Sequence, residues 1–218
     1  MILIFCLELN SRCISIFASH ISEELTEAQQ YALHVSPAKY ILNRSEARSV
    51  TIDKGVTSIN IENVINGILP RRVYIAFVSN EAYGGSYSKN PYYFEHCNVN
   101  QIACFINGQQ YPRKPYTPDF TNNKYITRPY LELLRASEQF NNVRTVITNE
   151  KFLKGYTLFA FNLSRDLSQG YVNIPTNGVM RFEIHFDREL AATINAIIFC
   201  EFDNQIIFED RNAIMDYR

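Results

Sequence analysis

The stretch at residues 70–112 decides the fold and reads PRRVYIAFVSNEAYGGSYSKNPYYFEHCNVNQIACFINGQQYP. Its β-branched and aromatic run at Arg72–Ser79 predicts a strand, and residues 98–106 predict a second strand. Asn107-Gly108 follows directly and predicts a two-residue type I′ turn, because both central positions of that turn need a positive φ. The stretch therefore indicates strands joined by a tight hairpin.

Residues 80–91, between these two strands, have the composition of a surface loop. Gly84-Gly85 predicts a turn and lacks the spacing and the Lys-Ser/Thr of a phosphate-binding loop. The loop and its flank carry four tyrosines: Tyr83, Tyr87, Tyr92 and Tyr93. Tyrosines can stack on bases or sugars, but a rigid ring with a polar tip also suits a partly dried protein contact. We favour a protein interface because the chain has no surplus of positive charge.

Strand patterns recur along the rest of the chain. The clearest lies at residues 179–187, where Met180, Phe182, Ile184 and Phe186 alternate with polar residues and are predicted to face the core. Further strands are predicted at residues 13–17, 39–42, 48–52, 58–62, 73–78, 157–161, 194–200 and 206–209. Asn66-Gly67 and Asn177-Gly178 are predicted turns.

Three of these strands, at 73–78, 157–161 and 194–200, are apolar on both faces, which predicts cover by a second layer or by a neighbouring subunit. Helical spacing predicts two helices, at 22–33 and 128–140. Many short strands and few helices indicate an all-β fold, namely a jelly-roll sandwich of about eight strands with one or two short helices in connecting loops.

The bulk composition limits the possible partners and chemistry. The chain has 218 residues, and its formal net charge of −1 argues against a nucleic-acid binder. The apolar start at residues 1–7 is too short to span a membrane and makes a poor signal peptide. The five cysteines are odd in number and none forms a C-x-x-C pair, which fits a reducing intracellular compartment without disulfides.

No residue pattern indicates catalysis, a metal or a cofactor. His96 and Cys97 are adjacent and would point to opposite faces of a strand, so they are not expected to form a nucleophile–base pair. Glu183, His185 and Asp187 share a strand face, where cross-strand charge pairs are expected in preference to a metal site.

The quoted stretch also resembles the second jelly roll of the double jelly-roll major capsid proteins of Polinton (Maverick) elements and adintoviruses. The resemblance covers residues 12–217. It rests on VYIAFVSNEAYGGSYSKNPYYFEHCNVN, GQQYP, YPRKPYTPDF, GYTLFAFNLSRDLS, MRFEIHF and the ending IFCEFDNQIIFEDRNAIMDY, in that order.

The resemblance implies a structural capsid protein without enzymatic activity. Residues 12–218 would form one jelly-roll domain, preceded by an extension or remnant at 1–11. In that family, three chains with two jelly rolls each form a pseudo-hexagonal capsomer, so the implied partners are further copies of the chain and other capsid proteins such as a penton protein. The implied location is the virion capsid, after assembly in the host cytoplasm or nucleus.

The resemblance also places candidate interface residues in the loop at 80–91 and around 112–119. They are Asn80, Tyr83, Tyr87, Asn90, Tyr92, Tyr93, Arg113 and Tyr116. The residues expected to be structural turns are Gly84, Gly85, Asn107, Gly108, Asn177 and Gly178. Family chains carry a first jelly roll upstream, so this chain is expected to be a fragment or a truncated or domesticated copy in a host genome. The alternative is a jelly-roll binding module for a glycan or protein; an enzyme of the cupin type is disfavoured because the four histidines lack H-x-H spacing.

Overall fold

The computed structural model describes residues 38–140, 145–164, 176–209 and 212–216. The predicted strand at 13–17, the predicted helix at 22–33 and the extension at 1–11 lie outside these residues. The chain divides into two compact units, one formed by Ala47–Cys200 and the other by Met1–Glu46 with Glu201–Arg218. Two long strands, β1 and β8, contribute residues to both units.

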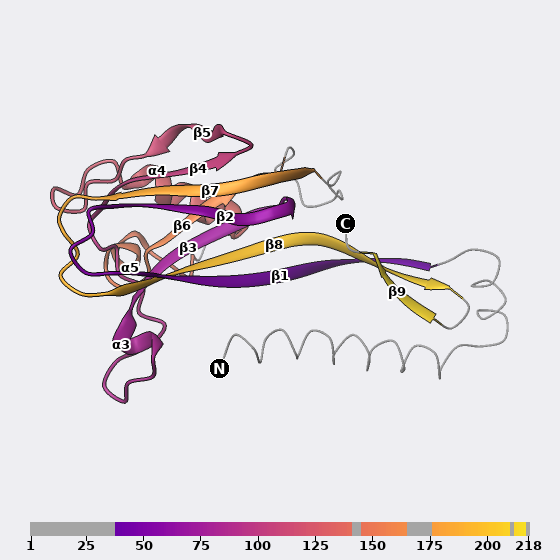
Figure 1. Ribbon diagram of the computed structural model, residues 1–218, viewed down its shortest axis with the longest axis horizontal. Helices are drawn as coiled ribbons and strands as arrows, with labels where there is room; N and C mark the ends of the chain where they lie inside the picture. The colour runs from indigo at the N-terminus through magenta and orange to yellow at the C-terminus, as the bar shows by residue number, and fades with distance from the viewer. Residues whose placement is uncertain (1–37, 141–144, 165–175, 210–211, 217–218) are drawn as a thin grey trace. The chain divides into compact units, whose positions relative to one another are not determined.

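The strands form two sheets (Figure 1). One sheet has the order β1-β8-β3-β6, with β9 also paired to β8, and the other has the order β2-β7-β4-β5. Their bounds are Ala38–Ile52 (β1), Ser58–Ile68 (β2), Arg72–Ser79 (β3), Val99–Ile106 (β4), Gln109–Tyr116 (β5), Leu158–Asn162 (β6), Asn177–Phe186 (β7), Ile194–Glu209 (β8) and Asn212–Asp216 (β9). Two sheets whose strands alternate in this way along the chain form a jelly roll, which confirms the predicted fold class.

The inner faces of the two sheets form the core of the Ala47–Cys200 unit. The side chains of Met180, Phe182, Ile184 and Phe186 in β7 are all buried, as their alternation predicts. Phe182 lies at the centre of its sheet, where β7 pairs with both β2 and β4, and its ring centroid lies 5.5 Å from that of Phe161 in β6. Aromatic contacts therefore connect the two sheets across the core.

The strand boundaries differ from the prediction in two places. The strands predicted at 39–42 and 48–52 are one strand, β1, and those predicted at 194–200 and 206–209 are one strand, β8. The residues between the predicted pieces are mostly polar. Backbone pairing with neighbouring strands nevertheless keeps them extended, since a ladder needs no side chain of a given polarity.

Two predicted turns are wrong. Asn66-Gly67 and Asn177-Gly178 lie within β2 and β7, where Gly67 pairs with Gly178. A Cβ on Gly178 would lie 2.9 Å from the Asn107 side-chain oxygen, which itself accepts a hydrogen bond of 2.9 Å from the Val179 backbone N–H. The glycine is therefore needed for a close approach of the neighbouring loop rather than for a reversal of the chain.

The predicted turn at Asn107-Gly108 forms between β4 and β5. Its two residues have φ values of 50° and 79°, and Ile106 pairs with Gln109 across it. We expect Gly108→Val to lower the free energy of unfolding by about 1 kcal/mol or more, because a β-branched residue is disfavoured at positive φ. Apart from the adjoining residues, no atom of the described part of the chain lies within 4 Å of the Cβ position, so the cost comes from the backbone conformation.

Chemical denaturation of the two proteins measures this effect. Gly108→Asn is the matched control, because asparagine tolerates a positive φ and is expected to lose less stability. Equal midpoints for wild type and Gly108→Val would contradict the predicted strain.

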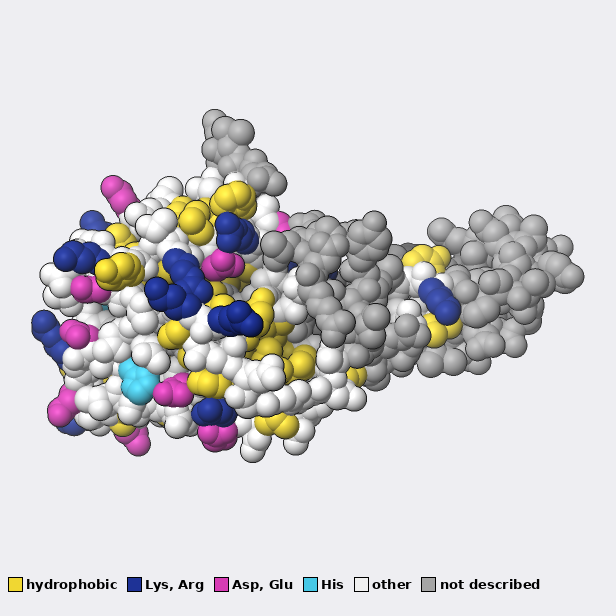
Figure 2. All heavy atoms as spheres, turned by 90° about the horizontal axis from the view of Figure 1, so that it is seen from above, with side chains coloured by type: hydrophobic (Ala, Val, Ile, Leu, Met, Phe, Trp, Pro, Cys, Tyr) yellow, Lys and Arg dark blue, Asp and Glu magenta, His cyan; other side chains and the backbone are white. Residues whose placement is uncertain are grey.

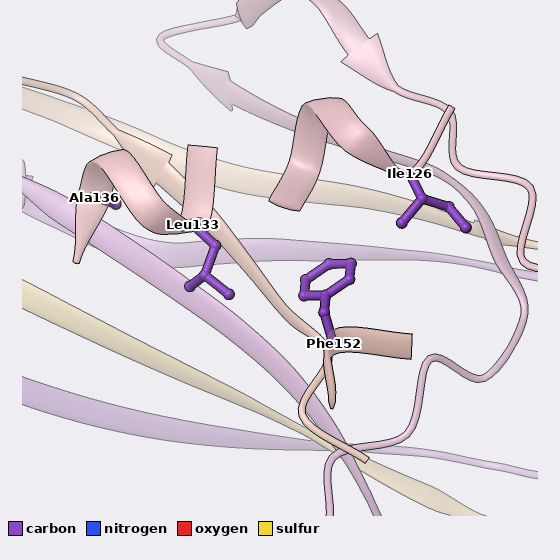
Figure 3. Packing of buried hydrophobic residues seen from close by; sticks show 5 residues of the cluster. Ile126, Leu133, Ala136 and Phe152 are labelled. Carbon is purple, nitrogen blue, oxygen red and sulfur yellow. The ribbon is translucent and has the colours of Figure 1, made fainter. Parts of the chain in front are cut away.

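A helical layer covers the outer face of β3 and β6. It consists of α4 (Thr127–Ala136) and α5 (Asn149–Leu153). Figure 3 shows the Phe152 ring of α5 between Leu133 of α4 and Ile126. These residues cluster with Ala136 and with Ala160 of β6. The doubly apolar strands at 73–78 and 157–161 are thus covered by the chain's own helices, so their pattern does not require a neighbouring subunit.

The helices also correct the sequence-based prediction. The helix predicted at 128–140 ends at Ala136, and Glu138 has a φ of 63°, which a helix does not continue through. α5 and the short α3 (Asn80–Tyr83) were missed, because one turn of helix has too few residues to show a period. None of the described helices is long and apolar enough to cross a membrane.

The second unit contains the first part of β1, the last part of β8, and β9. β9 pairs antiparallel with β8 from Gln205 opposite Asp216 to Glu209 opposite Asn212. The Arg44 guanidinium lies 4.3 Å from the centroid of the Phe202 ring and forms an ion pair with Glu46. A cation over an aromatic face and a nearby carboxylate therefore fix the position of Arg44.

Candidate interface in the loop between β3 and β4

The candidate loop begins as one turn of helix. α3 starts where β3 ends, and the Ser79 hydroxyl accepts a hydrogen bond of 3.4 Å from the Ala82 backbone N–H, as an N-cap does. Gly84 ends the helix, and Gly85 follows with a φ of 92°. The prediction of an irregular loop from residue 80 is therefore wrong for its first four residues, while the turn at Gly84-Gly85 forms.

A polar network fixes the base of the loop. The Asn195 side-chain amide of β8 donates to the Asn80 side-chain oxygen at 2.8 Å, and the Thr51 hydroxyl donates to the Asn195 oxygen at 2.8 Å. Asn195 is 1% exposed, so both of its bonds are shielded from water. The Tyr83 hydroxyl adds a bond of 2.9 Å to Ser49 of β1. Asn80 and Tyr83 thus hold the loop to the sheet.

The returning part of the loop is fixed against the segment before β6. Phe94 forms a parallel bridge with Tyr156, through a bond of 2.9 Å from the Phe94 N–H to the Gly155 carbonyl and one of 3.2 Å from the Thr157 N–H to the Phe94 carbonyl. The Tyr93 ring packs directly on Gly155, where an added Cβ would lie 2.1 Å from the ring. Glycine at 155 is therefore required both by this contact and by its φ of 90°.

Between these two anchors the loop exposes aromatic rings. Tyr87 is fully exposed, and Tyr92 and Tyr93 are 58% and 48% exposed. Within the loop, Lys89 pairs with Glu81, which leaves the loop nearly neutral. Asn90 is exposed and accepts a hydrogen bond of 2.9 Å from the Tyr92 N–H. Exposed rings on an anchored and neutral loop suit a contact with another protein surface, since few groups must be ordered on binding.

The other two candidate residues, Arg113 and Tyr116, differ in exposure. Arg113 is exposed in β5. Tyr116 is only 3% exposed, donates a hydrogen bond of 3.1 Å to the Ala160 carbonyl and packs 5.1 Å from the Phe161 ring. Tyr116 therefore belongs to the core, and its prediction as an interface residue is wrong. The segment at 112–119 is largely strand, because β5 extends to Tyr116.

His96 and Cys97 lie in the turn before β4 rather than on a strand. The His96 ring stacks on Phe120 at 4.5 Å, and its Nδ1 accepts a hydrogen bond of 3.0 Å from the Asn98 N–H. Burial lowers the pKa of His96, against the opposing effect of the Glu95 charge. Burial, with Glu95, raises the pKa of Cys97 to about 12. A thiol with this pKa is a weak nucleophile at neutral pH.

These pKa values predict the reactivity of the described cysteines. The described cysteines, Cys97, Cys104 and Cys200, are thiols and not half-cystines, and burial also raises the pKa of Cys104 to about 12. We expect iodoacetamide to alkylate all three slowly in the folded protein at pH 8, because the thiolate fractions of Cys97 and Cys104 are very small and Cys200 is buried. Under denaturing, non-reducing conditions mass spectrometry should find all five cysteines of the chain alkylated. Rapid native labelling of Cys97 would contradict its raised pKa.

Charged side chains are mixed in sign on the described surface. On the face in Figure 2, described Lys and Arg side chains are interspersed with Asp and Glu. His185 Nε2 lies 3.0 Å from Glu183, and Arg181 lies 3.7 Å from Glu62 on the neighbouring strand. Within the described ranges, no three His, Cys, Asp or Glu side chains are grouped so that they could hold a metal ion.

Comparison with known proteins identifies the fold. No protein-family model matches the sequence. An uncharacterized protein of Caenorhabditis elegans is 30% identical over 187 residues, which are 82% of this chain and 44% of that protein. PBCV-1 VP54, fitted into a reconstruction of the virophage Sputnik, covers 89% of this chain and 55% of its own, with a TM-score of 0.50 and 10% identity. The mavirus major capsid protein covers 83% of this chain and 41% of its own, with a TM-score of 0.44 and 12% identity.

The likeness to PBCV-1 VP54 shows a shared fold at a low sequence identity. This chain therefore shares the jelly-roll fold of PBCV-1 VP54. It spans about half the length of the proteins that it matches.

Proposed function

We propose that this chain is the second jelly roll of a double jelly-roll major capsid protein of the Polinton (Maverick) and adintovirus type. The observation that supports this most strongly is the jelly roll itself, which is similar to PBCV-1 VP54 over most of the chain. The sequence motifs at 70–112 support the narrower assignment to the Polinton (Maverick) and adintovirus type. In this role the domain works as a building block without catalysis, since its sheets form the packed core and its loops make the contacts.

The loop between β3 and β4 is the proposed contact with neighbouring subunits. Its tyrosines are exposed while both of its ends are anchored, so little conformational entropy is lost when a partner binds. The proposed partners are two further copies of the chain in a trimer, and beyond the trimer other capsid proteins such as a penton protein. The proposed location is the virion capsid, with assembly inside the host cell.

A first jelly roll completes the proposed capsomer, either from the same gene or from another chain. We expect the 218-residue chain alone to be irregularly oligomeric or poorly soluble, and co-expression with a first jelly roll to yield uniform trimers. Light scattering and electron microscopy of both preparations test this. Uniform closed particles formed by this chain alone would show a self-sufficient capsid protein and overturn the double jelly-roll assignment.

Variants of the loop test the contact itself. Tyr87→Ala with Tyr92→Ala should reduce the trimer fraction in the co-expressed sample by about tenfold, since exposed aromatic side chains at an interface centre contribute most of its energy. Tyr125→Ala removes a tyrosine whose exposure, 75%, lies between those of Tyr87 and Tyr92 but which lies outside the loop, and serves as the matched control. An unchanged trimer fraction in the double variant would exclude this loop as the contact.

A further inference from the structure

A cleft of about 300 Å³ lies where β4 begins and where β5 and β7 end. Its lining comes from three separated segments: residues 98–100, residues 117–121 with Tyr125, and Asp187. The volume is at the lower end of the range for small-molecule sites, about 300–1,000 Å³. Neither the proposed capsid role nor the tyrosine loop uses this cleft.

The polar groups of the cleft offer both acceptors and donors. Asp119 accepts two hydrogen bonds from Asn122, 2.9 Å from its N–H and 2.8 Å from its side-chain amide. Asp187 also lines the cleft, with Arg188 Nε 3.8 Å from its carboxylate. Asn98 and Asn100 also line the cleft, and an asparagine carboxamide can donate as well as accept. Carboxylates and carboxamides together can satisfy hydroxyl groups, which both donate and accept.

An aromatic ring stands at the edge of the same cleft. Tyr125 is 75% exposed and has a φ of 59°, which is uncommon for a bulky side chain. Its position follows from a closed turn, in which Asp119 and Lys124 exchange backbone hydrogen bonds of 2.8 and 2.9 Å. The ring is therefore presented beside the polar groups instead of packing on the sandwich. A flat apolar ring next to such groups matches a ligand with one C–H face and a rim of hydroxyls.

We infer that this cleft binds a neutral carbohydrate, with Tyr125 stacked on the sugar ring and Asp119, Asp187 and Asn100 bonded to its hydroxyls. Among the described residues no Lys, Arg or His lines the cleft, which disfavours phosphates and acidic sugars. Two carboxylates alone would also attract an amine or a divalent cation. The carboxamides and the exposed ring favour the sugar, because a cation site needs neither a donor amide nor a C–H contact.

Saturation-transfer NMR tolerates large particles, so the soluble fraction of the full 218-residue chain, oligomers included, tests the inference. The probes are the methyl glycosides of glucose, galactose, mannose and N-acetylglucosamine. Spermidine and calcium chloride test the alternative ligands, an amine and a divalent cation. We expect at least one glycoside to bind and Tyr125→Ala to weaken that binding by about tenfold. Tyr125→Phe, which keeps the ring, should retain most of it.

Two further variants make the result specific to the cleft. Asp187→Ala changes an exposed side chain and should weaken the same glycoside without loss of folding. Tyr87→Ala, in the loop between β3 and β4, should leave sugar binding unchanged. The inference is overturned if none of the four glycosides binds, if binding persists in both Tyr125→Ala and Asp187→Ala, or if only spermidine or calcium perturbs the cleft. These outcomes are independent of trimer formation, which tests the capsid role.

Discussion

Phe182→Ala is expected to lower the free energy of unfolding by about 3–5 kcal/mol. Phe182 is fully buried at the centre of its sheet, where its strand pairs on both sides, and its ring contacts Phe161 of the opposite sheet. Removal of the ring leaves a cavity between two sheets whose backbones are fixed by their ladders, so little collapse can compensate.

The matched control is the preceding residue of the same strand, Arg181. Arg181 points to the other face, where its guanidinium lies 4.1 Å from the centroid of the Phe105 ring. Arg181→Ala should cost less than about 1 kcal/mol, because its ion pair and its ring contact are partly exposed. Denaturant titration of both variants measures the difference. Equal losses would mean that the faces of β7 are assigned wrongly.

Phe152→Ala is expected to destabilise the isolated chain by a similar amount, about 3–5 kcal/mol. Its ring is fully buried in the helical layer, 5.6 Å from the Tyr130 ring and 6.5 Å from the Phe159 ring. Without it, the layer loses the ring that packs against Tyr130 of α4 and Phe159 of β6, and binding of a hydrophobic dye should increase as the outer face of β3 and β6 becomes more accessible.

Lys151→Ala is the control for this variant, because it shortens the neighbouring side chain of α5. The Lys151 amino group makes an exposed hydrogen bond of 3.3 Å to the Val146 carbonyl. It should change stability by no more than about 0.5 kcal/mol. If Phe152→Ala were as stable as Lys151→Ala, the outer face of β3 and β6 would have to be covered by something other than α5.

The sequence predicted those features that depend on neighbouring residues. Alternation identified β7 and its core face, because a strand places successive side chains on opposite sides. Asn107-Gly108 identified the hairpin turn, because positive φ at two adjacent positions restricts the residue types. The same dipeptide pattern failed at Asn177-Gly178, where the strand pairing and the approach of Asn107 decided the conformation.

The candidate interface was predicted in part. Composition located the exposed tyrosines, since Tyr87 and Tyr92 have no apolar pattern around them that would bury them. Composition could not separate Tyr116 from these residues. Tyr116 is buried because β5 places its ring over Phe161, a residue 45 positions away.

The sequence by itself determined the fold class, the core face of β7, the hairpin between β4 and β5, and the position of the tyrosine loop. These features follow from local periodicity and turn chemistry. Only the tertiary structure decided what covers β3 and β6, what anchors the loop, and which residues line the cleft beside Tyr125. Those features depend on contacts between residues far apart in the chain, such as Asn80 with Asn195 and Asn98 with Asp187. Such contacts form only when the two sheets have packed, and the residues that make them carry no local pattern.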